Sequence, residues 1–187
     1  MPFDRINYVL LLGAVGLIAT PDQLIHDVIG EGHMLLLVGD TMGHLGQSAL
    51  LAEVFNREDG DAPQVDLAAE KLNGDFIRAQ REWIDVCTDV SDGGVAVAAF
   101  EMADAAGVGM TLDDDTTAMA FGEDQARYLI GCSFDKAEAL MSAAGQAGVT
   151  LTSVGKFGGD TVTIGGSSVP LAELSEVYHT SFEAAVG

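Results

Sequence analysis

A glycine turn between two apolar segments constrains this chain more than any other feature. Residues 83–87 are mostly apolar and predict a short buried strand, whereas residues 95–106 carry only Glu101 and Asp104 as charges and predict a buried helix. Between them stands Asp89-Val90-Ser91-Asp92-Gly93-Gly94. Glycines let a ligand approach the main chain, and a helix start presents unpaired N–H groups to an anion. Strand, glycine turn and helix together are therefore typical of a phosphate site.

Two carboxylates belong to this turn. Asp89 and Asp92 would repel a bare phosphate, but they fit a Mg²⁺ ion held between carboxylate and phosphate oxygens. The alternative is a turn rich in Asp and Ser whose side chains cap a core helix. The motif alone leaves both interpretations open.

The charge balance narrows the classes of partner. The 187-residue chain has 29 acidic and 8 Lys or Arg residues, with a net charge of −21. We find no basic patch, and such a surface repels nucleic acid and anionic lipid. The longest apolar run, residues 8–19, is too short for a transmembrane helix. We therefore expect a soluble cytoplasmic protein without nucleic-acid or membrane partners.

The two cysteines, Cys87 and Cys132, lie in apolar segments without a CxxC motif. This placement predicts reduced core thiols rather than a zinc site, although a disulfide between them stays open.

Hydrophobic patterning predicts one α+β domain. Strands are expected at residues 8–19, 34–38, 83–87, 110–112, 128–132, 151–157 and 161–164. Helices are expected at residues 21–28 and 95–106, around residues 50–55, and after Asp66, Asp135 and Pro170. The order has no regular βαβ repeat. It favours one mixed or antiparallel sheet with helices packed on it.

A second glycine-rich loop, residues 39–48, follows the apolar segment 34–38, as ligand loops in α/β sheets tend to. A third polar stretch, residues 121–127, precedes the strand at 128–132. Within it, Glu123 and Arg127 have the spacing of a helical ion pair. The side chain of Gln125 is able to form a hydrogen bond with the backbone. These residues alone indicate an acidic α+β domain with a candidate magnesium–phosphate loop.

Six motifs in one order resemble a known family. They are residues 13–18, 36–40, 45–48, 89–94, 121–127 and 154–160. The series is similar to the C-terminal domain of the large, synthetase subunit of phosphoribosylformylglycinamidine synthase. The resemblance implies the fold of the C-terminal domain of aminoimidazole ribonucleotide (AIR) synthetase. It also implies an ATP-dependent ligase of purine biosynthesis, which converts formylglycinamide ribonucleotide and glutamine to the amidine.

The resemblance also implies ligands and partners. Mg²⁺ and ATP or ADP are expected in the full-length enzyme, and a glutaminase subunit and a small third subunit are expected as partners. The candidate phosphate or nucleotide ligands are Asp89, Ser91, Asp92, Gly93, Gly94, Glu123 and Gln125. Gly46 and Ser48 are weaker candidates, because Gln47 stands where the family commonly has a second glycine. Asp89 is the candidate metal ligand, because it is similar to an Asp ahead of a glycine turn that holds Mg²⁺ in the family. None of these residues is expected to be catalytic.

Family members are several times longer than this chain. We therefore expect residues 13–187 to be the last domain only, inactive alone, with residues 1–12 as a linker or a start foreign to the native chain. The missing upstream domains would be partners, and the isolated domain could self-associate through uncovered surfaces. The alternatives are a non-catalytic docking module, or the related domain of a selenophosphate, thiamine-phosphate or AIR synthetase.

Overall fold

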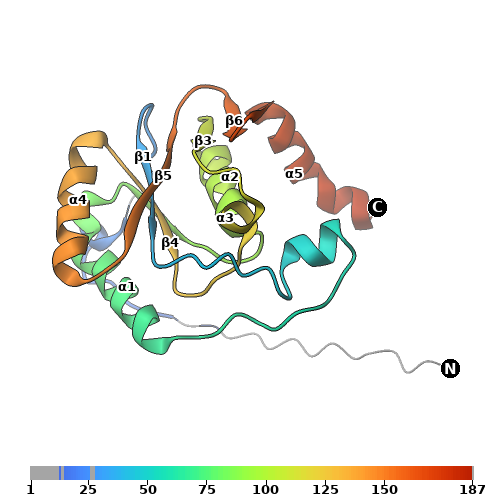
Figure 1. The fold of residues 1–187 in the computed structure, drawn as a ribbon. Helices are drawn as coiled ribbons and strands as arrows, with labels where there is room; N and C mark the ends of the chain where they lie inside the picture. The colour runs from blue at the N-terminus through green and yellow to red at the C-terminus, as the bar shows by residue number, and fades with distance from the viewer. Residues whose placement is uncertain (1–12, 14, 26–27, 187) are drawn as a thin grey trace.

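The computed structural model describes residues 13, 15–25 and 28–186 (Figure 1). The elements in chain order are η1 (Pro21–Gln23), β1 (Met34–Val38), η2 (Leu50–Val54), α1 (Leu67–Gln80), η3 (Arg81–Trp83), β2 (Val86–Asp89), α2 (Gly94–Ala106), β3 (Met110–Leu112), α3 (Thr117–Phe121), β4 (Tyr128–Cys132), α4 (Phe134–Ala147), β5 (Leu151–Phe157), β6 (Thr161–Ile164), β7 (Ser167–Pro170) and α5 (Leu171–Val186). None of the described helices is both long and apolar enough to cross a membrane.

The strands form one sheet in the order β2-β4-β1-β5-β3-β6-β7. Neighbouring strands are antiparallel except β3 and β6, which are parallel. The predicted mixed sheet with packed helices is confirmed.

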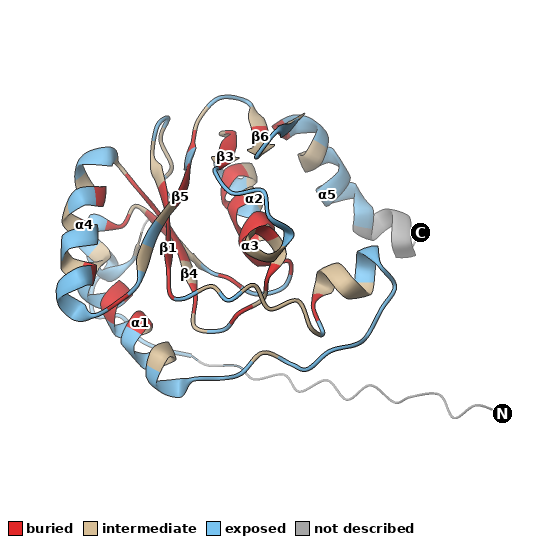
Figure 2. Ribbon diagram, in the orientation of Figure 1, coloured by how far each residue is buried: buried red, intermediate tan, exposed pale blue. Residues whose placement is uncertain are grey.

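Helices cover both faces of this sheet, as Figures 1 and 2 show. On β1, Leu35 and Leu37 belong to a core shared with α2, α3 and the start of α5. Leu36 and Val38 point to the other face, where they join a core shared with α1 and α4. All four side chains are buried, which is why β1 reads as a continuous apolar run rather than an alternating one. Each contributes about 1.5–3 kcal/mol by burial.

Helix α2 is the central helix of its layer. Its buried positions include Val95, Ala99 and Ala103, which pack against the sheet. The helix ends at Gly107, whose left-handed φ of 66° allows the N–H of Val108 to bond the carbonyl of Ala103. The predicted buried helix is therefore confirmed, with Gly94 as its first residue.

The strands at residues 34–38, 110–112, 128–132, 151–157 and 161–164 are also confirmed. The strand predicted at 83–87 begins only at Val86, because residues 81–83 close a 3-10 turn. The helix expected around 50–55 is a single π-helical turn, Leu50–Val54. Two short elements, α3 and β7, escaped prediction because four or five residues carry too little periodicity.

The strand predicted at residues 8–19 is not found in the part described. Residues 15–19 have no regular structure, and Val15 and Leu17 are fully exposed. A strand needs a neighbouring strand to satisfy its backbone, and this segment pairs with none of the described strands. Residues 1–12, expected to be a linker, lie outside the described residues. The helix expected at 21–28 is reduced to the 3-10 turn Pro21–Gln23, with residues 26–27 undescribed.

Replacing Gly155 by alanine should destabilise the domain by about 3 kcal/mol, the upper end of the usual cost of overpacking. A β-carbon at this position would lie 1.9 Å from the carbonyl oxygen of Thr111 and would push β5 from β3. Urea unfolding followed by circular dichroism measures the change. The matched control is Gly145→Ala on α4, where a β-carbon meets no atom within 4 Å and should stabilise slightly. Equal stability of the two variants would contradict this packing.

The Cys132 thiol should resist alkylation in the native state. Its side chain is fully buried, and burial raises its pKa to about 11, so the thiolate is scarce at pH 9. Raising the pH from 7 to 9 should accelerate iodoacetamide labelling of the unfolded chain but leave native Cys132 unmodified. Peptide mapping by mass spectrometry reads this out, and rapid native labelling would contradict the buried position.

Candidate functional site

Three loops meet at one end of the sheet. Tyr128, the first residue of β4, is in register with Val38 at the end of β1 and with Asp89 at the end of β2. The loops after β1 and β2 therefore come together with residues 122–127, which lead into β4. This arrangement brings most of the predicted site residues to one edge.

Glu123 joins two of these loops. Its Oε1 atom accepts hydrogen bonds from the backbone N–H of Gly93, at 2.8 Å, and from that of Ala49, also at 2.8 Å. Gly93 is the N-cap of α2, so this carboxylate lies at the positive end of the helix dipole, where negative charge is favourable. Glu123 and Gly93, both candidate ligands, are thus bonded to each other, and the carboxylate occupies one of the N–H groups expected to face an anion.

The two glycines of the turn allow close packing. Both have left-handed φ angles, 79° at Gly93 and 66° at Gly94. A β-carbon on Gly94 would lie 2.7 Å from the carbonyl oxygen of Gly122. The sequence analysis expected a ligand to lie close to the backbone of these glycines. At Gly94 the close neighbour is instead the protein's own loop before β4.

The remaining candidates of this turn are accessible. Asp89, Ser91 and Asp92 are all exposed, while Val90 between them is buried. The turn is closed by the N–H of Gly94 donating to the carbonyl of Ser91 at 3.0 Å. The two carboxylates are open to solvent at the end of β2 and the start of α2.

Gly46 and Ser48 have local structural partners. Ser48 is buried, and its hydroxyl donates to the carbonyl of Leu45 at 2.7 Å and accepts from the N–H of Leu51 at 3.3 Å. A β-carbon on Gly46 would lie 2.4 Å from the carbonyl oxygen of Asp61. Between these two residues, Gln47 has a left-handed φ of 56°, a conformation that favours glycine. The hydroxyl of Ser48, by accepting the N–H of Leu51, caps the short turn η2.

Arg127 is the buried cation of the site, and its role was missed from the sequence. Its guanidinium donates to the carbonyls of Asp124 and Gly122, at 3.0 and 2.5 Å, and to the hydroxyl of Thr41 at 3.2 Å. Its ion-pair partner is Asp124, at 3.9 Å, rather than Glu123 as the spacing suggested. Burial lowers the pKa of Arg127, while the charges of Asp124 and Glu123 oppose the shift. The signal in the sequence that could have indicated a buried cation is the position of this arginine directly before an apolar strand.

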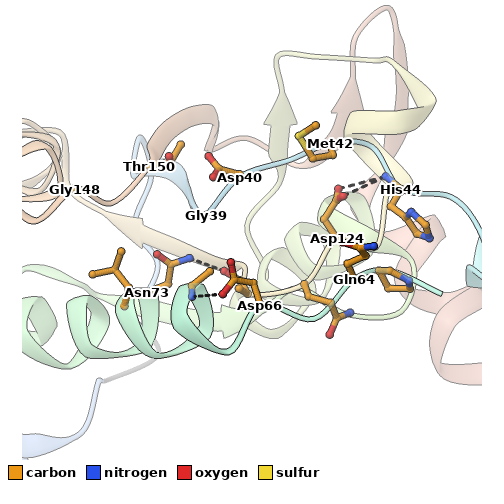
Figure 3. Close-up of a pocket in the computed structure, with 15 residues that line it drawn as sticks. Gly39, Asp40, Met42, His44, Gln64, Asp66, Asn73, Asp124, Gly148 and Thr150 are labelled. Atoms are coloured by element: carbon orange, nitrogen blue, oxygen red, sulfur yellow. Dashed lines mark hydrogen bonds between the residues drawn. The ribbon is translucent and has the colours of Figure 1, made fainter. Parts of the chain in front are cut away.

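Asp124 holds the loop after β1. Its Oδ2 atom accepts from the N–H of Gly43 at 2.9 Å, and its carboxylate is also bonded by the N–H of His44 (Figure 3). The backbone N–H of Glu123 in turn donates to the carbonyl of His44 at 2.8 Å. Residues 43–44 and 123–124 are therefore tied to each other in both directions.

Beside these contacts lies a cavity of about 410 Å³ (Figure 3). Its walls come from the loop after β1, the approach to and first half of α1, the residues before β4 and those before β5. The lining residues are Gly39, Asp40, Met42, His44, Pro63, Gln64, Asp66, Ala69, Leu72, Asn73, Asp124, Gln125, Ala126, Gly148 and Thr150. Of the predicted site residues, Gln125 is in this lining.

The backbone next to Gln125 is fixed from α1. Ala126 has a left-handed φ of 60°, its N–H donates to Glu70 Oε1 at 2.9 Å, and its carbonyl accepts from Asn73 Nδ2 at 2.8 Å. Because both polar groups of Ala126 are bonded, the exposed Gln125 sits on a rigid rim of the cavity.

The described residues contain no cluster of three or more His, Cys, Asp or Glu side chains able to enclose a metal ion. Asp89 and Asp92 are exposed, and carboxylates are the side chains that Mg²⁺ binds together with phosphate oxygens and water.

Comparison with known proteins identifies relatives over nearly the whole chain. The chain is 66% identical over 175 residues to phosphoribosylformylglycinamidine synthase subunit PurL of Ruegeria pomeroyi, which covers 94% of this chain and 24% of that protein. The PurL subunit of Zymomonas mobilis is 45% identical, over 89% of this chain and 24% of its own length. The chain thus spans about a quarter of the length of these curated relatives.

Solved structures share the fold. PurL from Thermotoga maritima complexed with FGAR superposes with a TM-score of 0.67 at 20% identity, covering 83% of this chain and 30% of that one. Thiamine-monophosphate kinase from Stenotrophomonas maltophilia has a TM-score of 0.52 at 18% identity, covering 79% and 54%. The sequence model of the AIR synthase related protein, C-terminal domain, matches residues 30–166. The chain therefore belongs to the family of AIR synthase related C-terminal domains.

Proposed function

We propose that this chain is the C-terminal domain of a synthetase subunit of phosphoribosylformylglycinamidine synthase, acting in cytoplasmic purine biosynthesis. The observation that carries the proposal is the 66% identity to a PurL subunit across 94% of the chain. The relatives at 66% and at 45% identity are both PurL subunits, which favours the synthetase over the other members of the superfamily.

The reaction joins nitrogen to carbon at the expense of ATP. In the mechanism that the family resemblance implies, ATP phosphorylates the glycinamide carbonyl oxygen of formylglycinamide ribonucleotide, not the formyl oxygen, and leaves as ADP. Ammonia from glutamine then adds at the same carbon and phosphate departs. We assign no step of this chemistry to the residues of this domain, and the domain alone would be inactive. The solved structure of PurLQS from T. maritima supports further subunits as partners, and we expect these to be a glutaminase and a small third subunit.

The domain would contribute an auxiliary or interface site for a magnesium nucleotide. Solved T. maritima PurL structures include complexes with ATP and with ADP. Here Asp89 and Asp92 are the exposed carboxylates that would hold Mg²⁺, and the ion would compensate the repulsion between an anionic ligand and a chain of net charge −21. Gln125, on the rim of the cavity, would add an amide contact.

A docking role is the second candidate, and specific contacts favour it. The N–H of Gly93 is already bonded to Glu123, and the hydroxyl of Ser48 is bonded within its own loop. Under this alternative, the glycine loops shape a surface for the rest of the subunit and bind no nucleotide.

The native polypeptide should be several times larger than the 19.4 kDa of this chain. An antibody raised against the domain and used to blot source-cell extract measures this directly. A native band at 19.4 kDa would contradict the assignment to a longer synthetase and would favour the docking role.

Asp89→Asn and Asp92→Asn should each weaken binding of Mg·ADP to the synthetase subunit by about ten-fold, or roughly 1.4 kcal/mol. Each removes one negative charge next to the proposed ion. Isothermal titration calorimetry gives the affinities. Asp160→Asn is the matched control, because Asp160 is also exposed beside a glycine turn but lies beyond β5, at the opposite end of the sheet. Unchanged affinity in both test variants would favour the docking role.

A further inference from the structure

One carboxylate oxygen links two loops that are distant in the sequence. Glu123 Oε1 is the acceptor for both Gly93, 30 residues away, and Ala49, 74 residues away. The first N–H begins α2 and the second lies just before η2. A single atom therefore joins the two glycine loops to each other.

The backbone of Glu123 is held independently of these two bonds. Its N–H donates to the carbonyl of His44, and the neighbouring carbonyl of Gly122 accepts from the buried guanidinium of Arg127. Asp124, on the other side, is bonded to the loop after β1. Because the backbone is held on both sides of Glu123, the position of its Cα does not depend on the two hydrogen bonds of the side chain.

We propose that Glu123 is a positioning residue that couples the loop at residues 46–49 to the turn at residues 89–94, and that it acts through its hydrogen-bond acceptor rather than as a ligand of metal or nucleotide. The proposal rests on the proposed function for its consequence in binding: the turn presents Asp89 and Asp92 in one geometry only while Glu123 holds Gly93. The coupling itself is a property of the free domain.

The physical reason is the shared acceptor. When the side chain of Glu123 moves away, the N–H groups of Gly93 and Ala49 lose their partner in the same event. Gly93 is a buried residue and its bond to Glu123 is partly buried, so an opening that leaves its N–H unpaired is costly. The two loops should therefore open together, and an event that orders one of them orders the other.

Hydrogen exchange in the absence of ligand tests the coupling. In Glu123→Ala, amide exchange at both residues 46–50 and residues 91–95 should accelerate about ten- to hundred-fold, the range expected for losing a hydrogen bond to a charged group. Exchange in β5, at residues 151–157, should be unchanged. The control is Glu138→Ala, which removes an exposed glutamate from α4 and should alter neither loop. Acceleration in one loop alone, or in neither, overturns the coupling.

A conservative variant of Glu123 distinguishes a role in positioning the two loops from a role as a charged ligand. Glu123→Gln keeps an oxygen that accepts two N–H bonds and removes the negative charge. It should therefore restore slow exchange in both loops, and it should bind Mg·ADP within about three-fold of the wild type, whereas Glu123→Ala binds at least ten-fold more weakly. If the Gln variant loses as much affinity as the Ala variant, Glu123 acts as a charged ligand and the positioning role is wrong.

A measurement on the unaltered protein covers the case in which Glu123→Ala fails to fold. Native-state exchange in rising urea should give the amides of Gly93 and Ala49 the same opening free energy and the same dependence on urea. Different values for the two amides would overturn the coupling. Because this readout needs no nucleotide, it stands even if Mg·ADP does not bind and the proposed function fails.

Discussion

The candidate site depends on one buried charge. The guanidinium of Arg127 has no exposed side-chain surface, and a cation in that position is stable only when its donors are paired. Its partners are the carbonyls of Gly122 and Asp124, the hydroxyl of Thr41 and the carboxylate of Asp124. The partners at Gly122 and Asp124 hold residues 122–127 around the cation, and the bond to Thr41 joins these residues to the loop after β1. The contacts of Glu123 and Asp124 with residues 43–44 strengthen the same junction.

Acidic side chains serve the fold by accepting backbone hydrogen bonds. Such bonds are made by Glu31 with Gly159, Asp66 with Ala68 and Ala69, Glu70 with Ala126, Asp85 with Ser133, Glu123 with Gly93 and Ala49, and Asp124 with Gly43 and His44. In a chain of net charge −21, this use turns carboxylates into caps for loops and helix starts. It also explains why a turn that resembles an anion site has one N–H group bonded to the protein's own glutamate.

Patterning predicted the core elements well and the short or isolated ones poorly. Strands β1 and β4 are largely apolar segments of five residues, and α2 is an apolar segment between glycines, so their local signals are strong. The segment containing Val15 and Leu17 has a similar apolar signal, but no described strand pairs with it. Composition cannot distinguish a strand with a partner from the same residues without one. The elements α3 and β7 were missed because five and four residues are too few to show a clear periodic pattern.

By itself the sequence determined the family, the mixed sheet with its helices, and the position of the glycine turns, because these follow from local order along the chain. It also singled out Asp89, Asp92, Glu123 and Gln125 as polar groups in loops. Only the tertiary structure decided what those groups touch. The register that places both Val38 and Asp89 opposite Tyr128 brings three distant loops to one edge. Glu123 then meets two backbone donors, while Gln125, two residues further along, faces a cavity. Hydrogen bonds between residues 30 to 86 positions apart depend on strand pairing, and no local pattern encodes them.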